Sequence, residues 1–172
     1  MEAPTIKTRN DFPKLIRYHE LRHGVELGVA AGDFSEVLLS SCLYRLISID
    51  RWNDHHGDEE YFQTISRLDP YPESLVMRAT FSAAAVYFTE DRHSFDLIYI
   101  DGYAHEGQEN GETLETWWPL LRSGGVFAGH DYHPRWQPTI DVVDAFMRKR
   151  GLTFRVTEEK EPEFPSWWAI KP

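Results

Sequence analysis

The sequence has a single cysteine in 172 residues, no long apolar run and a deficit of basic side chains. Cys42 cannot form an internal disulfide, which is typical of a reducing compartment, so we expect a cytoplasmic protein. No stretch approaches the roughly 20 apolar residues of a membrane-spanning helix. The opening MEAPTIKTRNDF lacks the apolar core of a signal peptide. These features argue against membrane insertion and secretion.

Charge and composition narrow the class of partner. The chain has 28 acidic and 18 basic residues and a net charge of -10. Nucleic acids and anionic membranes attract clusters of Lys and Arg, so we expect neither as a partner. The 41% hydrophobic content argues against disorder. A small molecule is therefore the expected substrate of a compact chain.

Apolar runs and amphipathic stretches alternate along the sequence, which predicts a doubly wound α/β fold. We expect strands at 24–27, 46–50, 75–77, 95–101, 126–130, 153–156 and 167–170. Helices are expected at about 10–21, 34–41, 58–68, 82–88, 109–121 and 139–150. The sheet should be mostly parallel, with one antiparallel strand near the C-terminus, because a helix-free loop joins the last two strands. We expect one domain over residues 1–172, with an N-terminal helix in 1–22 and the core in 23–172.

The most informative stretch is VELGVAAGDFSEVLL, Val25–Leu39, followed by an apolar run that ends on Asp50. A strand would enter a turn containing Gly28 and Gly32, and a helix would begin near Asp33. The glycines let the backbone approach a ligand, and the free N–H groups of the new helix can hold an anion. Asp50 lies where a ribose-binding acid is expected. The pattern predicts a site for a nucleoside-containing cofactor at the carboxyl edge of the sheet.

The spacing of the glycines separates two classes of cofactor. A dinucleotide-binding turn has the pattern G-x-G-x-x-G, whereas here Glu26 precedes G-x-x-x-G. The carboxylate of Glu26 would repel a pyrophosphate but attract the ammonium group of S-adenosylmethionine, whose ribose hydroxyls could bind Asp50. S-adenosylmethionine is therefore favoured, and an NAD-dependent oxidoreductase is the less favoured alternative.

A second polar group follows two strands in the middle of the chain. One buried strand ends on Asp101, and the next ends on His130 with Asp131 after it, while His105 lies in the loop beyond Asp101. Neighbouring parallel strands end at the same edge, so we expect these four side chains to converge there. Convergent carboxylates and imidazoles are candidates for catalysis or metal binding. A turn or cap role for Asp131 and a loop-anchoring role for His105 remain alternatives.

Together these motifs resemble the class I S-adenosylmethionine-dependent methyltransferases, and within them the small bacterial methyltransferase-24-like group. The resemblance spans about residues 24–132. The blocks I-D-G-x-x-H and G-G-x-x-x-G-H-D-Y are more specific than the glycine motif. The residues that carry it are Glu26, Gly28, Gly32, Ile49, Asp50, Arg78, Phe81, Ser82, Ala83, Ile100, Asp101, Gly102, His105, Trp118, Leu121, Gly124, Gly125, Ala128, Gly129, His130, Asp131 and Tyr132.

The resemblance implies a Rossmann-like fold and methyl transfer to a small hydroxylated acceptor, most simply O-methylation. It places the methionine end of the cofactor along Glu26, Gly28 and Gly32, and the ribose at Asp50. The further cofactor contacts that it implies are Arg51, Trp52, Phe81, Ser82 and Asp101. The loop around Trp136 is expected to shape the acceptor pocket.

In metal-using relatives, an acid after the fourth strand and a polar pair after the fifth bind a divalent cation. Asp101, His130 and Asp131 occupy these positions, which implies a candidate Mg²⁺ or Mn²⁺ site. His130 departs from the common Asp, and Mg²⁺ prefers oxygen ligands while imidazole suits transition metals. Metal-assisted and metal-free versions of the reaction both remain open.

Catalysis would consist mainly of alignment, because the sulfonium methyl group is already electrophilic. A hydroxyl acceptor also needs its proton removed. His105 or His130 could act as the base, with Asp101 and Asp131 positioning the imidazole or holding a metal. A non-catalytic domain that binds S-adenosylmethionine is the alternative to an enzyme. A homo-oligomer is a further expectation, because the consecutive Trp167 and Trp168 alternate in a strand and only one should face inward.

Overall fold

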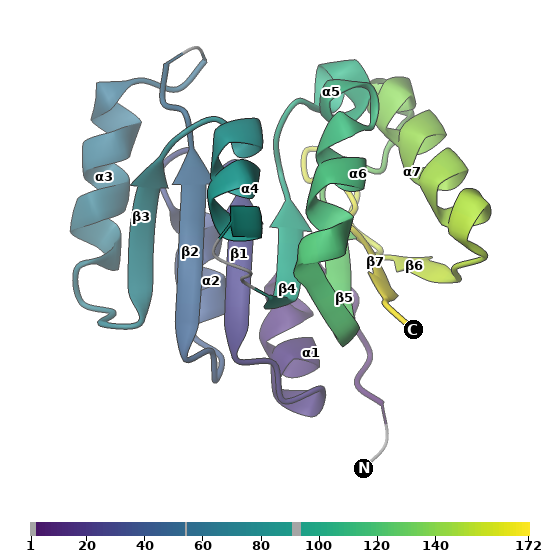
Figure 1. The fold of residues 1–172 in the computed structure, drawn as a ribbon, viewed down its shortest axis with the longest axis horizontal. Coiled ribbons are helices and arrows are strands. Elements are labelled where there is room, and N and C mark those ends of the chain that lie inside the picture. The colour runs from purple at the N-terminus through teal and green to yellow at the C-terminus, as the bar shows by residue number, and fades with distance from the viewer. Residues whose placement is uncertain (1–2, 54, 91–93) are drawn as a thin grey trace.

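The computed structural model describes residues 3–53, 55–90 and 94–172, whose strands form a seven-stranded sheet (Figure 1). The sheet order is β3-β2-β1-β4-β5-β7-β6. β7 runs antiparallel to both β5 and β6, and the other pairs are parallel, which confirms the predicted single reversed strand. The strands are β1 (His23–Leu27), β2 (Arg45–Asp50), β3 (Ser74–Arg78), β4 (Phe95–Ile100), β5 (Leu121–Gly129), β6 (Phe154–Val156) and β7 (Trp167–Ile170).

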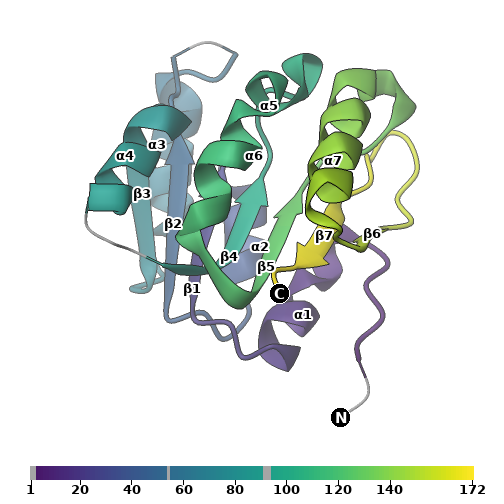
Figure 2. The ribbon, with the colours of Figure 1, turned by 45° about the vertical axis from the view of Figure 1, so that its right-hand side comes forward.

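Helices cover both faces of the sheet, as Figure 2 shows. The α-helices are α1 (Phe12–Tyr18), α2 (Asp33–Leu39), α3 (Asp58–Leu68), α4 (Phe81–Glu90), α5 (Gly107–Asn110), α6 (Glu112–Trp117) and α7 (Gln137–Arg150). Short 3₁₀ turns occur at η1 (Arg9–Asp11), η2 (Ala104–Glu106), η3 (Trp118–Leu120) and η4 (Pro134–Trp136). None of the helices in the described part of the chain has the length and apolarity that a bilayer crossing needs.

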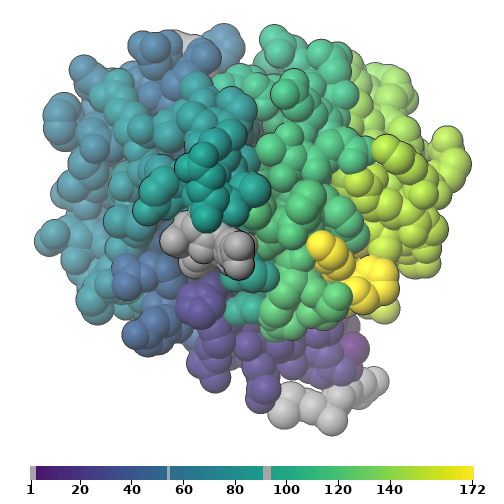
Figure 3. Space-filling view, in the orientation of Figure 1, coloured from purple at the N-terminus to yellow at the C-terminus, as the bar shows by residue number. Residues whose placement is uncertain are grey.

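Two apolar clusters, one on each face, hold the layers together. One joins the sheet to α4, α6 and α7, whose side chains cover that face in the space-filling view (Figure 3). The other joins the sheet to α1, α2 and the end of α3. The central strand β4 is buried along its whole length, with Ile98 in the first cluster and Tyr99 in the second. Each large apolar side chain buried in this way contributes roughly 1.5–3 kcal/mol.

The helix predicted over 109–121 is interrupted, and β5 begins earlier than expected. α6 ends at Trp117, and Pro119 in the following 3₁₀ turn lacks the N–H that a continuing helix needs. β5 starts at Leu121, so Gly124 lies inside the strand and not in a turn before it. The β4–β5 register shifts between Phe95 and Leu97, as in a β-bulge.

Two other expectations differ from the structure. The N-terminal helix is shorter than the predicted 10–21, because a 3₁₀ turn precedes α1 and the helix ends at Tyr18. Trp167 and Trp168 are both buried, 0% and 7% exposed. Helices cover both faces of the sheet, so consecutive residues of β7 point into different clusters. The tryptophan pair therefore gives no sign of an interface between subunits.

The carboxyl ends of β1 and β4 meet where the strand order reverses, which is the usual ligand position in such sheets. Leu27 pairs with Ile100, so Gly28 and Asp101 come side by side. Gly28 has a φ of +92°, and a β-carbon there would lie 2.1 Å from the carbonyl oxygen of Asp101. Glycine at this position is therefore required by strand packing, whatever ligand lies above it.

We expect Gly28→Ala to destabilise the protein by at least about 2 kcal/mol, because a left-handed residue with a β-carbon is strained and the clash is with backbone. Gly57→Ala is the matched control, since its β-carbon would have Glu60 Oε2 at 3.9 Å as its nearest contact. Urea unfolding followed by circular dichroism measures both changes. Equal unfolding midpoints would contradict the packing argument.

Candidate active site

A cavity of about 810 Å³ lies at the carboxyl edge of the sheet. Glu26 and Gly28 of the first turn, and Asp50 at the end of β2, lie in its wall. Asp101 and Asp131, after β4 and β5, lie in the same wall. Its volume is within the range of about 300–1,000 Å³ that is usual for small-molecule sites. The topology thus brings both predicted groups of residues to one cavity.

Asp50 holds the glycine-bearing turn in place through hydrogen bonds to its backbone. Its Oδ2 accepts hydrogen bonds from the backbone N–H groups of Val29 at 2.8 Å and Ala30 at 3.2 Å. Its Oδ1 accepts the N–H of Trp52 at 3.1 Å. The Trp52 indole is buried and donates to the Ala30 carbonyl at 2.8 Å. The carboxylate therefore shapes the turn, and its remaining lone pairs leave capacity for further donors.

Glu26 is a buried carboxyl group, only 1% exposed. The hydroxyl of Ser35 donates to it, and Ser48 in turn donates to Ser35 at 2.9 Å. Burial raises the pKa of Glu26 to about 8, against the opposing effects of Ser35 and Arg9. Near neutral pH the carboxyl group is thus mostly protonated, and a cation entering the cavity would favour its charged form.

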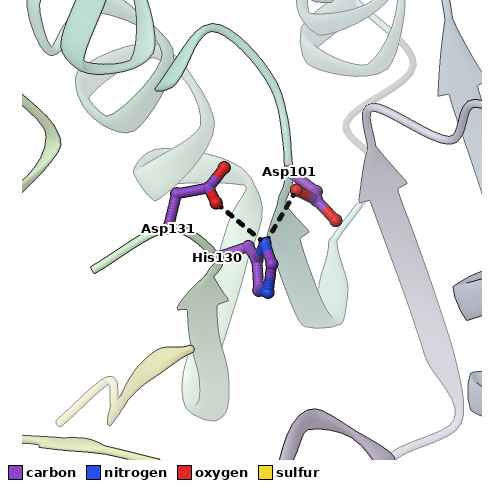
Figure 4. A group of neighbouring side chains, drawn as sticks. All are labelled: Asp101, His130 and Asp131. Carbon is purple, nitrogen blue, oxygen red and sulfur yellow. Dashed lines mark ion pairs between the residues drawn. The ribbon is translucent and has the colours of Figure 1, made fainter. Parts of the chain in front are cut away.

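Asp101, His130 and Asp131 form a compact polar group, drawn in Figure 4. His130 Nδ1 lies 3.3 Å from Asp101 Oδ1 and 3.2 Å from Asp131 Oδ1. The side chains are 9% exposed for His130, 21% for Asp101 and 15% for Asp131. Asp131 has a φ of +61°, a conformation that is strained for a residue with a side chain and often found at functional sites. The backbone thus turns sharply at Asp131, beside His130.

The charges of this group are tightly coupled. Burial lowers the pKa of His130, but Asp101 and Asp131 outweigh it and raise that pKa to about 9. Burial has the opposite effect on the carboxyl group of Asp101 and raises its pKa, but His130 and Arg9 hold that pKa well below its usual range. His130 Nδ1 therefore carries a proton that faces both carboxylates, and Asp101 is ionised at neutral pH.

Arg9 also belongs to the site. Its Nη2 donates to Asp101 Oδ2 at 2.8 Å, and its Nη1 lies 3.3 Å from His130 Nε2. The guanidinium carbon lies 4.0 Å from the centroid of the Phe34 ring. No sequence pattern marks Arg9, because it lies in a polar stretch and its partners are far away along the chain.

One ligand atom from each of Asp101, His130 and Asp131 lies within 4.8 Å of the others, a spacing that suits a cation. Their charges and contacts do not suit one. His130 Nδ1 faces both carboxylates, and Arg9 holds the second oxygen of Asp101. A divalent cation would have to displace the proton of His130 and compete with Arg9. As arranged, the group does not fit a divalent cation.

Some of the other predicted residues line the cavity, and some do not. Phe81, His105 and Trp136 lie in the wall, and the rings of His105 and Trp136 are 4.2 Å apart between centroids. Of the described residues, Asn10 and Glu163 also contribute to the wall without having been predicted. The predicted residues that lie outside the described wall are Gly32, Arg51, Trp52, Ser82 and His130.

Residues 25–132 match a family model described as a methyltransferase domain, which covers more than half of the chain. The match includes the glycine turn and the Asp101–Asp131 region. A search of curated protein sequences finds no match.

Solved structures with this fold include several methyltransferases. An O-methyltransferase from Bacillus cereus in complex with SAH has a TM-score of 0.75 at 14% identity, covering 98% of this chain and 84% of that one. The O-methyltransferase TomG from Streptomyces achromogenes in complex with SAM has a TM-score of 0.70 at 19% identity, covering 95% and 79%. An rRNA methylase from Streptococcus thermophilus has a TM-score of 0.64 at 14% identity, covering 94% and 93%. At these identities the likeness shows the fold alone.

We expect Glu26→Gln to stabilise the unliganded protein increasingly as the pH rises. The folded-state pKa of about 8 exceeds the ordinary 4.5, so between these values the folded protein keeps a proton that the unfolded chain loses. Wild-type stability therefore falls with pH in this window, by at most about 1.4 kcal/mol per pH unit, and the amide removes that loss. Urea unfolding of both proteins, measured from about pH 5 to about pH 8, gives the difference in stability across the interval between the two pKa values. A difference that stays constant with pH would contradict the raised pKa.

Proposed function

Because this chain belongs to the methyltransferase-24-like group of class I S-adenosylmethionine-dependent methyltransferases, we propose that it methylates an oxygen of a small hydroxylated molecule. The proposal is supported by the observation that the residues expected at the cofactor and those expected at the acceptor line the same cavity. Glu26, Gly28 and Asp50 lie at the turn expected to hold the cofactor, and Asp101 and Asp131 lie at the position expected for the acceptor.

The proposed cofactor is S-adenosylmethionine, with its ammonium group at Glu26 and its ribose at Asp50. Glu26 would become ionised as it meets the ammonium group, since a neighbouring positive charge favours the charged form of a carboxyl group. The structural role of Asp50 supports its ribose contact, because its hydrogen bonds to Val29 and Ala30 fix the carboxylate at the cavity wall. When bound, the cofactor supplies a methyl group to the acceptor oxygen, and the C–S bonding pair goes to sulfur to give S-adenosylhomocysteine.

His105 is our candidate for the base that takes the proton of the acceptor hydroxyl. It is exposed in the cavity wall, and its ring is oriented by contact with Trp136. His130 is less suited, because Nδ1 faces two carboxylates and Nε2 faces Arg9. Asp131, in the wall and next to His130, is suited to orient the hydroxyl by accepting its hydrogen bond before the proton leaves.

The composition of the wall supports a small acceptor over a nucleic acid. Among the described residues of the wall, Arg9 is the sole Lys or Arg, and it is paired with Asp101. The acids Asp33, Glu106 and Glu163 lie in the same wall. Phosphate backbones are bound by basic side chains, so this surface would repel them. Free Cys42 supports the cytoplasmic location that we also propose.

The cofactor assignment is tested by calorimetric titration with S-adenosylmethionine and with NAD. We expect binding of the former, and at pH 8 about tenfold weaker binding by Glu26→Gln, because a charge-assisted hydrogen bond is lost. Glu90→Gln is the control, since Glu90 is exposed at the end of α4 and should change nothing. The Glu26 variant should lose affinity while gaining stability, which separates binding from unfolding. Preferential binding of NAD would refute the proposal.

The catalytic assignment is tested by transfer of a tritiated methyl group to a panel of hydroxylated acceptors. We expect His105→Gln to lower kcat by about 10²–10⁴-fold, the usual range for general bases, with S-adenosylmethionine still bound. His19→Gln is the matched control, because His19 lies at the end of α1 and outside the described wall. A full rate in the His105 variant would remove it as the base. Cofactor binding without transfer to any acceptor of the panel would favour a non-catalytic binding domain.

A further inference from the structure

Arg9 brings a permanent positive charge into the polar group of the cavity. A guanidinium stays protonated in proteins and presents several donors in a fixed plane. Here one nitrogen donates to Asp101 Oδ2 at 2.8 Å and another lies 3.3 Å from His130 Nε2. Arg9 thus contacts two of the three side chains that would have to ligate a cation.

The position of Arg9 is fixed by contacts on several sides. Its side chain is only 19% exposed and stacks on Phe34, a contact of the cation–π type. Its backbone N–H donates to the Glu159 carboxylate. The same N-terminal segment is held two residues earlier, where the Lys7 carbonyl accepts the N–H of Glu158 at 2.6 Å. The guanidinium is therefore a built part of the site and not a mobile surface charge.

Arg9 donates a hydrogen bond to Asp101 Oδ2, a carboxylate oxygen that could otherwise coordinate a metal. Asp101 has its Oδ1 toward His130 and its Oδ2 on Arg9. Asp131 Oδ1 also faces His130. Two carboxylates without Arg9 would leave a site whose negative charge favours a divalent cation. With Arg9 present, one of these charges is already neutralised at hydrogen-bonding distance.

We propose that Arg9 is the resident cation of this site. Its guanidinium binds Asp101 and lies beside His130, in place of a divalent metal, and the group binds no divalent cation while Arg9 is present. Arg9 acts as a positioning residue, because it orients Asp131 and the acceptor through Asp101 and His130. We also expect the reaction to proceed without added metal, an expectation that rests on the proposed methyl transfer. Whether the protein binds a divalent cation can be tested without any acceptor.

The test is a titration of the protein with Mn²⁺, in which electron paramagnetic resonance reports the free ion. The wild-type protein should leave the free Mn²⁺ signal unchanged through the millimolar range. Arg9→Gln should bind Mn²⁺ at least about tenfold more tightly than the wild type, because removal of the guanidinium exposes the carboxylates. Adding Asp131→Asn to the Arg9→Gln variant should abolish the gain and so locate the ion. Arg9→Lys, which keeps the charge, should gain less than Arg9→Gln.

Two results would overturn the proposal. One is tight Mn²⁺ binding by the wild type that disappears in Asp131→Asn; the other is an equal response of Arg9→Lys and Arg9→Gln. The wild-type titration needs no variant, so the proposal can fail even if Arg9→Gln does not fold. Calorimetric titration of the wild type with S-adenosylhomocysteine tests the proposed methyl transfer separately from the role of Arg9. A wild type that does not bind S-adenosylhomocysteine would refute the methyl transfer, whereas the Mn²⁺ results bear on Arg9 alone.

Discussion

The close approach of β1 and β4 is the constraint on which the site depends. Their carboxyl ends are so near each other that a β-carbon on Gly28 would lie 2.1 Å from the Asp101 carbonyl oxygen. This contact places the glycine turn, which Asp50 holds through Val29 and Ala30, next to the loop that follows β4. The residues expected at the cofactor and those expected at the acceptor thereby share one cavity.

The surroundings shift the pKa values of two carboxyl groups of this cavity, the buried Glu26 and the half-buried Asp101, in opposite directions. Glu26 accepts a hydrogen bond from the Ser35 hydroxyl, and burial raises its pKa to about 8. Asp101 is held by Arg9 and His130, which keep its pKa far below the usual range. Environments that separate the pKa values of neighbouring acids commonly separate their roles. Glu26 is suited to respond to an incoming cation, whereas the charge of Asp101 is fixed by the protein.

The sequence was sufficient for those features that follow from local pattern. Gly28, Asp50 and Asp101 all lie at strand ends, and the alternation of strands and helices determines which edge they share. Pro119 signals the interruption after α6, but the apolar spacing around it continues as in a helix and predicts one over 109–121. Arg9 could not be found, since its bonds to Asp101 and His130 join residues 92 and 121 positions apart. Contacts of this range depend on tertiary packing and leave no trace in local periodicity.

The attachment of Arg9 also has a consequence for the order in which the molecule is completed during synthesis. Arg9 leaves the ribosome early, but its partners Asp101, His130 and Glu159 follow 92, 121 and 150 residues later. The N-terminal segment therefore cannot form its contact with Glu159 until the loop before β7 has been synthesised. A nascent chain can form the glycine turn well before it can assemble the polar group. The turn expected at the cofactor can therefore be complete before the polar group expected at the acceptor.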